Sequence, residues 1–291
     1  MRGSVGLGAV SIFCALTLAA CGNGKVIGSG PLPTPAPVTP NVSFEFKVPT
    51  ASSSPLTIVS GRDGFIYFTE QAASQIGQLT TGGVIKEIKT KTAGAGPAGL
   101  LVSTGDGNIW FTESLNHSIA TITSFTTGAT TEYPTTWANS KPQFLTNGTV
   151  QNTMYFTDPG ANAIGEITTT GTVTGPFAIP SANSNPQGIT QGPDNNIWFC
   201  EAGAAKIGHL NATTNTVDQE FALAAGANPY NIIVGPDGAL WFTENNPAAP
   251  KLGRLTTTGV LNEYPLTGAK SAVGMTLDVF NNIDVVDSAN N

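Results

Sequence analysis

Charged residues are scarce in this chain of 291 residues, and most of those present are acidic. Only 11% of the residues are charged, and the formal net charge is -7. The sequence contains no basic cluster. Binding to nucleic acid or to an anionic membrane surface depends on Lys and Arg side chains, so this composition disfavours both. We expect no nucleic-acid partner.

Cysteine is also rare, with three residues in the whole chain. Cys14 lies in the predicted N-terminal leader and Cys21 is the predicted site of lipid attachment just after it, which leaves Cys200 without a partner for an intramolecular disulfide. Cys200 replaces a Thr of a repeated block, and no base stands beside it in the sequence. We therefore interpret it as a packing thiol rather than a nucleophile.

The chain lacks stretches with the 3.6-residue periodicity of an amphipathic helix. It has instead 34 Gly and 20 Pro, a composition typical of many short strands joined by tight turns. The sequence thus predicts an all-β fold. Its length is sufficient for one closed β domain.

One block of about ten residues recurs along the chain, with a period of about 43 residues. Each copy is a turn followed by an aromatic strand that ends in a carboxylate, and the clearest copy is residues 235–244 (GPDGALWFTE). A period in the low forties is about the length of one four-stranded propeller blade. The anchor positions of the copies are Phe68, Phe111, Phe156, Phe199, Phe242 and Val285.

Four strands can be placed within one repeat. Residues 231–234 and 239–243 form a predicted hairpin around an Asp-Gly turn, and residues 251–255 and 260–264 supply a third and an outer strand. Six repeats begin in this way. We therefore predict a β-propeller of about six four-stranded blades.

The two ends of the repeat series are incomplete. The last repeat stops after its second strand, at residue 287. Near the other end, residues 46–49 (FKVP) are similar to the outer-strand segment 177–180 (FAIP). A propeller can close when one terminus completes the last blade, so we predict that this N-terminal strand joins it. The alternative is a seven-bladed ring truncated in mid-repeat.

The repeat resembles that of the streptogramin B (virginiamycin B) lyase family. The resemblance rests on residues 235–244 together with 251–259 (KLGRLTTTG) and 263–265 (EYP), and it extends over residues 44–287. Members of this family are β-propellers, and its enzymes linearise a cyclic depsipeptide antibiotic by elimination across its ester bond, using a His base and a magnesium ion. The resemblance implies the fold first and the chemistry second.

The first 20 residues are predicted to be a signal peptide, because Arg2 precedes an apolar run that is too short for a comfortable membrane span. Residues 18–21 (LAAC) resemble the lipobox of bacterial lipoproteins, which implies cleavage before Cys21 and lipid attachment to it. An ordinary secretory leader with a chance cysteine is the alternative. Residues 21–40 are rich in Gly and Pro and are expected to tether the propeller domain, residues 41–291, to the membrane. We expect a location in the cell envelope, at the outer membrane if the host is Gram-negative.

An acidic residue ends the second strand of every repeat. The first and second strands are antiparallel, so these acids and the starts of the first strands should emerge on the same face. Carboxylates are ligands for hard cations such as Mg²⁺, and we take Glu113, Glu201 and Glu244 as candidate metal ligands. The alternative is that the acids accept hydrogen bonds from loop amides. The six acids are Glu70, Glu113, Asp158, Glu201, Glu244 and Asp287.

Elimination requires a base, and His is the usual supplier. The chain has two His residues. His117 follows Glu113 in the loop on the predicted site face, so His117 and Tyr230 are the catalytic candidates, with a surface role as the alternative for His117. His209 lies in a third strand, where we expect a packed or solvated side chain. The first-strand starts carry no His and are Leu56, Ala98, Gln143, Gln187, Tyr230 and Val273.

Two functions are consistent with these features. The first is a lipid-anchored propeller that binds a small molecule or a protein on the face carrying the acids, without catalysis. The second is a magnesium-dependent carbon–oxygen lyase that opens a cyclic ester. The absence of His from the first-strand starts favours the binding protein, whereas the resemblance favours the lyase.

Overall fold

The computed structural model describes residues 45–289, which contain 22 β-strands and no helix. Across these residues there is accordingly no helix of the length and apolar character needed to cross a bilayer. The chain divides into two units, Met1–Pro49 and Thr50–Asn291. The predicted signal peptide, the predicted lipid-attachment residue Cys21 and the predicted tether lie outside the described residues.

The strands form five four-stranded antiparallel sheets and one two-stranded sheet, which we call blades 1 to 6 in chain order. This confirms the predicted fold class. Blades 1 to 3 consist of β1 (Pro55–Ser60), β2 (Ile66–Glu70), β3 (Gln75–Leu79), β4 (Ile85–Lys89); β5 (Pro97–Val102), β6 (Ile109–Glu113), β7 (Ser118–Ser124), β8 (Ala129–Pro134); and β9 (Leu145–Asn147), β10 (Thr153–Asp158), β11 (Ala163–Thr168), β12 (Val173–Ala178). Blades 4 to 6 consist of β13 (Pro186–Gln191), β14 (Ile197–Glu201), β15 (Lys206–Asn211), β16 (Thr216–Ala222); β17 (Pro229–Val234), β18 (Leu240–Glu244), β19 (Lys251–Leu255), β20 (Leu261–Pro265); and β21 (Ala272–Leu277), β22 (Ile283–Asp287).

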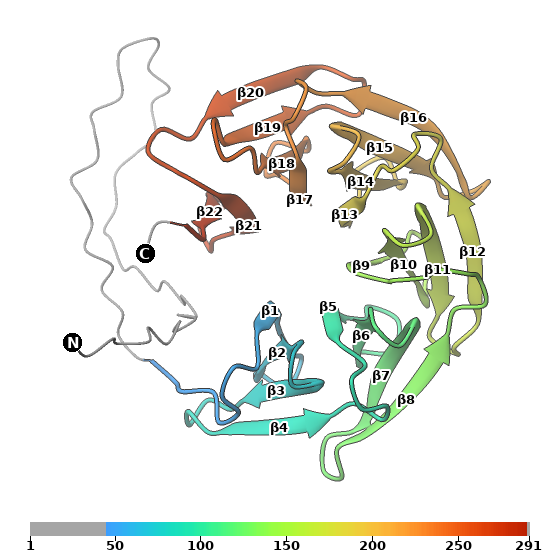
Figure 1. The fold of residues 1–291 in the computed structure, drawn as a ribbon, viewed down its shortest axis with the longest axis vertical. Helices are drawn as coiled ribbons and strands as arrows, with labels where there is room; N and C mark the ends of the chain where they lie inside the picture. Colours follow the sequence, from blue (N-terminus) through green and yellow to red (C-terminus); the bar gives the residue numbers. More distant parts are fainter. Residues whose placement is uncertain (1–44, 290–291) are drawn as a thin grey trace, which may run out of the picture. The chain divides into compact units, whose positions relative to one another are not determined.

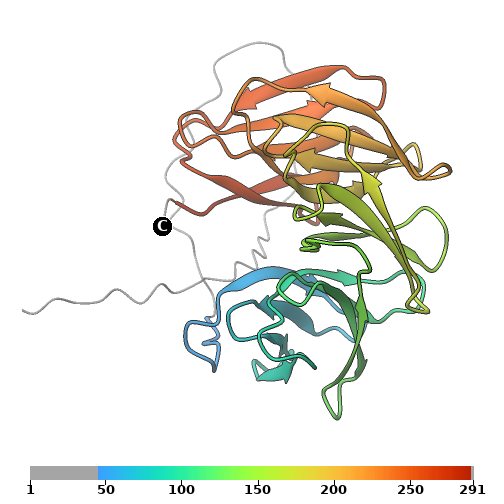
Figure 2. The ribbon, with the colours of Figure 1, turned by 45° about the vertical axis from the view of Figure 1, so that its right-hand side comes forward.

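The blades of the second unit follow one another around a common centre (Figure 1). The first strand of each blade is innermost and the fourth is outermost, and Figure 2 shows the sheets stacked face to face. Neighbouring inner strands contact one another in the order β1, β5, β9, β13, β17 and β21. We call this set of inner strands the hub.

The Asp of the repeated turn fixes the hairpin between the first two strands. In blade 5, Asp237 accepts hydrogen bonds from the Ala239 backbone N–H at 3.2 Å and from the Trp241 indole N–H at 2.9 Å. Gly238 between them has a φ of +73°, a conformation that favours glycine. The spacing of Asp, Gly and Trp in the repeat is therefore that of a turn tied to its own strand.

The aromatic anchors form the core, as predicted. Phe68, Phe111, Phe156, Phe199 and Phe242 are at most 1% exposed. Each ring lies over a small residue of the third strand, and in blade 4 a Cβ added to Gly208 would come within 2.2 Å of the Phe199 ring. Glycine is required there because the ring occupies the space of a side chain.

Blade 6 differs from the prediction. Its sheet contains only β21 and β22 among the described residues, and residues 45–48 form no strand. The strand expected at residues 46–49 is therefore not formed. The propensity of the FKVP segment for an outer strand is local, whereas pairing depends on tertiary contacts that the segment itself does not encode.

Candidate functional site

The starts of the first strands and the ends of the second strands lie together, as the topology predicts. Antiparallel pairing places a Pro or Ala at the start of the first strand opposite the acid that ends the second. The pairs are Pro55 with Glu70, Pro97 with Glu113, Pro186 with Glu201, Pro229 with Glu244 and Ala272 with Asp287. Both sets of residues therefore mark one face of the blades.

The acids of blades 1 to 5 do not form an exposed ring on that face. Glu70, Glu113, Asp158, Glu201 and Glu244 are at most 1% exposed. In blade 4, a Cβ added to Gly208 on the third strand would lie 2.7 Å from a carboxyl oxygen of Glu201. The Glu201 side chain thus crosses its own sheet instead of entering the hub.

The crossing brings each inner glutamate to a second glutamate on the outer strand of the same blade. Gly208 pairs with Glu220, so Glu201 and Glu220 meet over the glycine. Burial, followed by Glu220, raises the pKa of Glu201 to about 8. Burial dominates in the other blades too, and it raises the pKa to about 7 for Glu70, Glu113 and Glu244, which face Glu87, Glu132 and Glu263.

The outer glutamates bind the segment through which the chain enters the blade. In blade 2, Glu132 accepts hydrogen bonds from the Thr92 backbone N–H at 2.6 Å and from its hydroxyl at 2.9 Å. In blade 4, Glu220 accepts from the Ser181 N–H at 3.0 Å and from the Lys206 ammonium at 3.0 Å. These carboxylates therefore hold the connection between blades.

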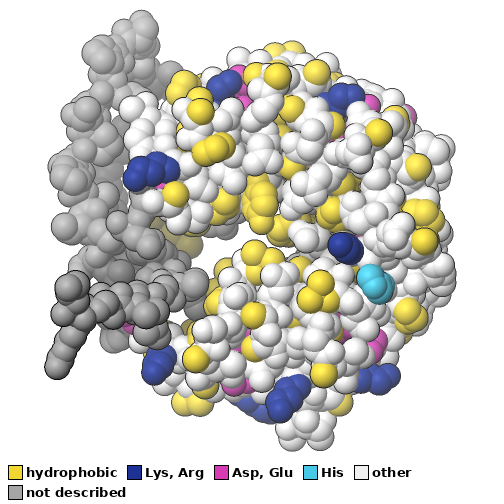
Figure 3. Space-filling model, viewed as in Figure 1, with side chains coloured by type: hydrophobic (Ala, Val, Ile, Leu, Met, Phe, Trp, Pro, Cys, Tyr) yellow, Lys and Arg dark blue, Asp and Glu magenta, His cyan; other side chains and the backbone are white. Residues whose placement is uncertain are grey.

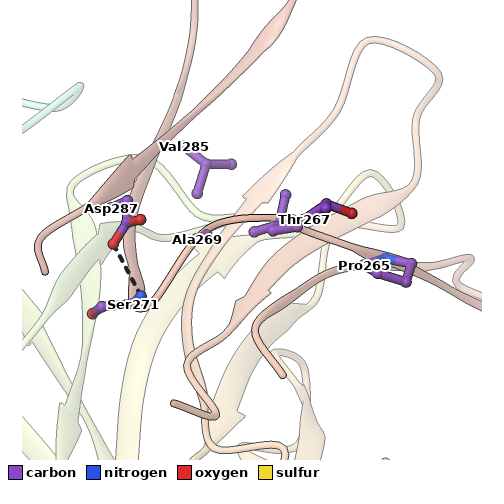
Figure 4. Close-up of a pocket in the computed structure, with 7 residues that line it drawn as sticks. Pro265, Thr267, Ala269, Ser271, Val285 and Asp287 are labelled. Atoms are coloured by element: carbon purple, nitrogen blue, oxygen red, sulfur yellow. Dashed lines mark hydrogen bonds between the residues drawn. The ribbon is translucent and has the colours of Figure 1, made fainter. Parts of the chain in front are cut away.

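Blades 3 and 6 have an aspartate at the inner position, and there it binds the entering segment directly. Asp158 accepts from the Ser140 hydroxyl at 2.5 Å and from the Lys141 N–H at 2.7 Å. Asp287 accepts from the backbone N–H groups of Lys270 and Ser271, each at 3.0 Å. Figure 4 shows the hydrogen bond between Ser271 and Asp287 at the edge of a pocket. Both residues line this pocket together with Pro265, Thr267, Ala269 and Val285. The expected bonding of loop amides to these acids therefore holds for the two aspartates.

The structure does not bring the predicted metal ligands together. Glu113, Glu201 and Glu244 belong to three different sheets, and each faces a glutamate of its own blade. Residues 45–289 contain no group of three or more His, Cys, Asp or Glu side chains arranged to hold a metal ion. These three glutamates do not fit a shared magnesium site, and a bound Mg²⁺ would need other ligands.

The two histidines have partners within the scaffold. His117 is exposed in the loop between β6 and β7, where its ring Nδ1 contacts the Ser140 carbonyl and its own carbonyl accepts from Thr135. His209 is 4% exposed. Its ring nitrogens lie 2.5 Å from Asp218 and 3.3 Å from Asp194, so the expected packed role holds.

The first strands carry a β-bulge at their start in five blades, a feature that the sequence did not lead us to expect. The register shifts just after the opening Pro in blades 1, 2, 4 and 5, and just after Ala272 in blade 6. In blade 2, Thr112 accepts from the bulged Gly99 N–H at 2.8 Å and donates to the Gln143 carbonyl of blade 3 at 2.6 Å. The Thr that recurs after the aromatic anchors was the feature of the sequence that could have predicted this bulge. Blade 4 has Cys200 there, fully buried, with a pKa raised by burial.

An aromatic pair occupies the hub between blades 3 and 5. Tyr230, in the bulge of β17, meets Phe144, just before β9, edge to face with ring centroids 5.8 Å apart. Both rings are half-buried, and burial raises the pKa of Tyr230. Figure 3 shows that uncharged and hydrophobic side chains surround the central opening, with charged ones farther out. Nothing in the repeat pattern of the sequence marked Phe144 as a residue of the candidate site.

Six successive antiparallel sheets packed around inner strands define a β-propeller. The chain matches the model of the virginiamycin B lyase family over residues 38–285 and belongs to that family. No match was found among curated proteins.

Solved structures agree with this assignment. The chain is similar to a catalytically inactive His-to-Ala variant of virginiamycin B lyase from Staphylococcus aureus with quinupristin, with 35% identity over 81% of this chain and 78% of that one and a TM-score of 0.74. A streptogramin B lyase structure has 31% identity, coverage of 83% and 79%, and a TM-score of 0.76. A gluconolactonase from Xanthomonas campestris, at 14% identity, coverage of 81% and 84% and a TM-score of 0.58, shares the fold alone.

Proposed function

We propose that this protein is a lipid-anchored propeller that binds a ligand at the hub without catalysing the opening of an ester ring in that ligand. The observation that carries the proposal is the absence of His from all six first-strand starts. Elimination at neutral pH requires a positioned base. In the related lyase from Staphylococcus aureus, replacement of one His by Ala gives a catalytically inactive protein.

The hub residues indicate the chemistry of the ligand. Tyr230 and Phe144 offer a pair of aromatic rings, and Gln143, beside Phe144, offers an amide group. Such a site suits an apolar, ring-bearing molecule with amide or ester carbonyls, because aromatic side chains supply contact area and a few polar groups orient the ligand. A cyclic depsipeptide belongs to this class, and quinupristin accompanies the related lyase.

The alternative function, a magnesium-dependent carbon–oxygen lyase, is favoured by membership of the family. Its catalytic candidates would be His117 and Tyr230. The raised pKa of Tyr230 keeps the phenol protonated at neutral pH, so this side chain is a hydrogen-bond donor rather than a base. His117 already contacts the Ser140 carbonyl in its loop.

Titration with quinupristin separates the two functions. Binding is followed by protein fluorescence, and ring opening by chromatography, because elimination yields a linear isomer of unchanged mass. We expect saturable binding without a linear product, with or without Mg²⁺. Tyr230→Ala should weaken binding about tenfold or more, because truncating a well-packed aromatic anchor costs about 2 kcal/mol or more and about 1.4 kcal/mol is tenfold. Tyr264→Ala, on the outer strand, is the matched control. A linear product that requires Mg²⁺ would establish the lyase instead.

Anchoring through Cys21 is a separate part of the proposal. It rests on the lipobox-like residues 18–21 and on the Pro-rich segment that follows. Cys21→Ser should abolish incorporation of a labelled fatty acid and move the protein out of the membrane fraction. Label retained by the variant would refute the anchor while leaving hub binding untouched.

A further inference from the structure

Four blades contain two glutamate side chains that face each other across a third strand, and in blade 1 these are Glu70 and Glu87. In the other three blades a lysine also lies beside the pair, and the pairs are Glu113 with Glu132, Glu201 with Glu220, and Glu244 with Glu263. We propose that each pair holds one shared proton that closes its blade, so that the propeller takes up protons when it folds and loses stability as the pH rises.

The geometry of blade 4 shows why a proton is needed. Glu201 is 0% exposed, and neither of its carboxyl oxygens has a hydrogen-bond partner among the described residues. The second carboxyl of the pair belongs to Glu220, which lies opposite Gly208, the glycine that the Glu201 side chain crosses. Two ionised carboxylates so placed repel each other, and Glu201 has no donor of its own, whereas a proton on Glu201 turns it into a donor for Glu220.

The surrounding charges assign the proton to the inner residue. The Glu220 carboxylate accepts from Lys206 and from Ser181, and these bonds lower its pKa. Glu201 remains the neutral partner, with its pKa raised to about 8 by burial against a smaller opposing effect of Lys206. The other group beside it is Cys200, whose own pKa is raised.

Blades 5 and 2 repeat this arrangement with different neighbours. In blade 5, the Lys251 ammonium contacts Glu263 and lies 3.9 Å from Glu244. In blade 2, the groups that face Glu113 besides Glu132 are the Asn116 amide, which donates to it at 3.0 Å, and Lys91. One Glu113 oxygen and one Glu244 oxygen still have no donor among the described residues.

The sign of the pH effect follows from the raised pKa values. The inner glutamates titrate near 4.5 in the unfolded chain and near 7 to 8 in the folded one. The folded state therefore binds more protons between these values. The stabilisation is complete below about pH 4.5 and is lost as the pH rises through about 7 to 8.

The test compares chemical unfolding of the full chain at pH 5.5 and at pH 9. We expect the urea midpoint of the unchanged protein to fall between these pH values. Glu201→Gln should flatten the fall and should raise the midpoint above that of the unchanged protein at pH 9, because an amide N–H donates to Glu220 without a proton. Asp158→Asn in blade 3 is the matched control and should lower the midpoint at both pH values, since its carboxylate already accepts donors.

Proton release provides a second measurement that does not depend on any variant. Unfolding the unchanged protein at pH 6 in weak buffer should release protons, and Glu201→Gln and Glu244→Gln should each release about one fewer. No release, or a midpoint that does not change with pH, would overturn the proposal. A midpoint at pH 9 that rises with CaCl₂ or MgCl₂ in the unchanged protein but not in Glu201→Gln would also overturn it, because a cation would then occupy the place of the proton.

Discussion

Blades 3 and 4 have the same strand order but close around different side chains. Blade 4 pairs Glu201 with Glu220, and it is Glu220 that holds the entering segment. In blade 3 the inner Asp158 holds that segment itself. The entering segment is thus held by an outer-strand carboxylate in blade 4 and by a second-strand carboxylate in blade 3. An acid that recurs at the end of each second strand reflects how a blade is closed, and the positions that differ at the hub are the better guide to function.

The replacement of the glutamate pair in blade 3 involves several positions at once. Gly165 lies opposite the outer-strand kink at Gly175, where other blades carry the outer glutamate. Trp137 fills that space: its ring stacks on Phe156 with centroids 6.0 Å apart, and a Cβ added to Gly175 would lie 3.4 Å from it. The Trp137 indole N–H donates to Asp158 at 2.7 Å. A shorter acid, a glycine and an indole together replace the carboxyl pair.

The largest expected effect is common to both blades. Phe156→Ala and Phe199→Ala should each lower the free energy of unfolding by about 3 to 5 kcal/mol, because each removes a fully buried ring from between two sheets. Urea unfolding measures both. A loss below about 1 kcal/mol in either variant would show that the shared core, and not only the closure, differs between the blades.

Trp137→Phe tests the closure that is particular to blade 3. The variant keeps an aromatic ring over Phe156 but removes the indole N–H from the buried Asp158 carboxylate. We expect a loss of about 1 to 3 kcal/mol, the usual consequence of leaving a buried acceptor short of a donor. The same measurement on Phe177→Leu, in the outer strand of that blade, controls for general repacking. Equal losses in the two variants would remove the special role of the indole.

Cys200→Thr, in blade 4, should have the smallest effect. It restores the residue that the other four-stranded blades have after the aromatic anchor, where Thr69, Thr112, Thr157 and Thr243 each accept from a backbone N–H in the first strand or just before it. A change within about 1 kcal/mol of the unchanged protein is expected, because the new hydroxyl finds the same backbone partners. Unfolding by urea checks it, and a loss above about 2 kcal/mol would show that the blade 4 bulge differs from the others.

The sequence was sufficient for the fold because its information is periodic. Recurrence of the aromatic anchor predicted the blades and the burial of Phe199, and antiparallel pairing placed Glu201 at the correct face. The direction of that side chain could not be predicted from its place at a strand end, since crossing the sheet depends on space over Gly208. The recurring outer glutamate, such as Glu220, was a signal for the pairing. Phe144 lies outside the periodic pattern, so its meeting with Tyr230 required the structure.

The most direct test of the shared proton is a carbon-13 NMR titration of carboxyl-labelled glutamate in the folded protein. At pH 6.5 we predict four signals at the shift of a protonated carboxyl, from Glu70, Glu113, Glu201 and Glu244, with the Glu201 signal moving only as the pH passes about 8 and disappearing in Glu201→Gln. If every glutamate of the folded protein shows the shift of an ionised carboxylate at pH 6.5, the blades are not closed by a proton and the account is contradicted.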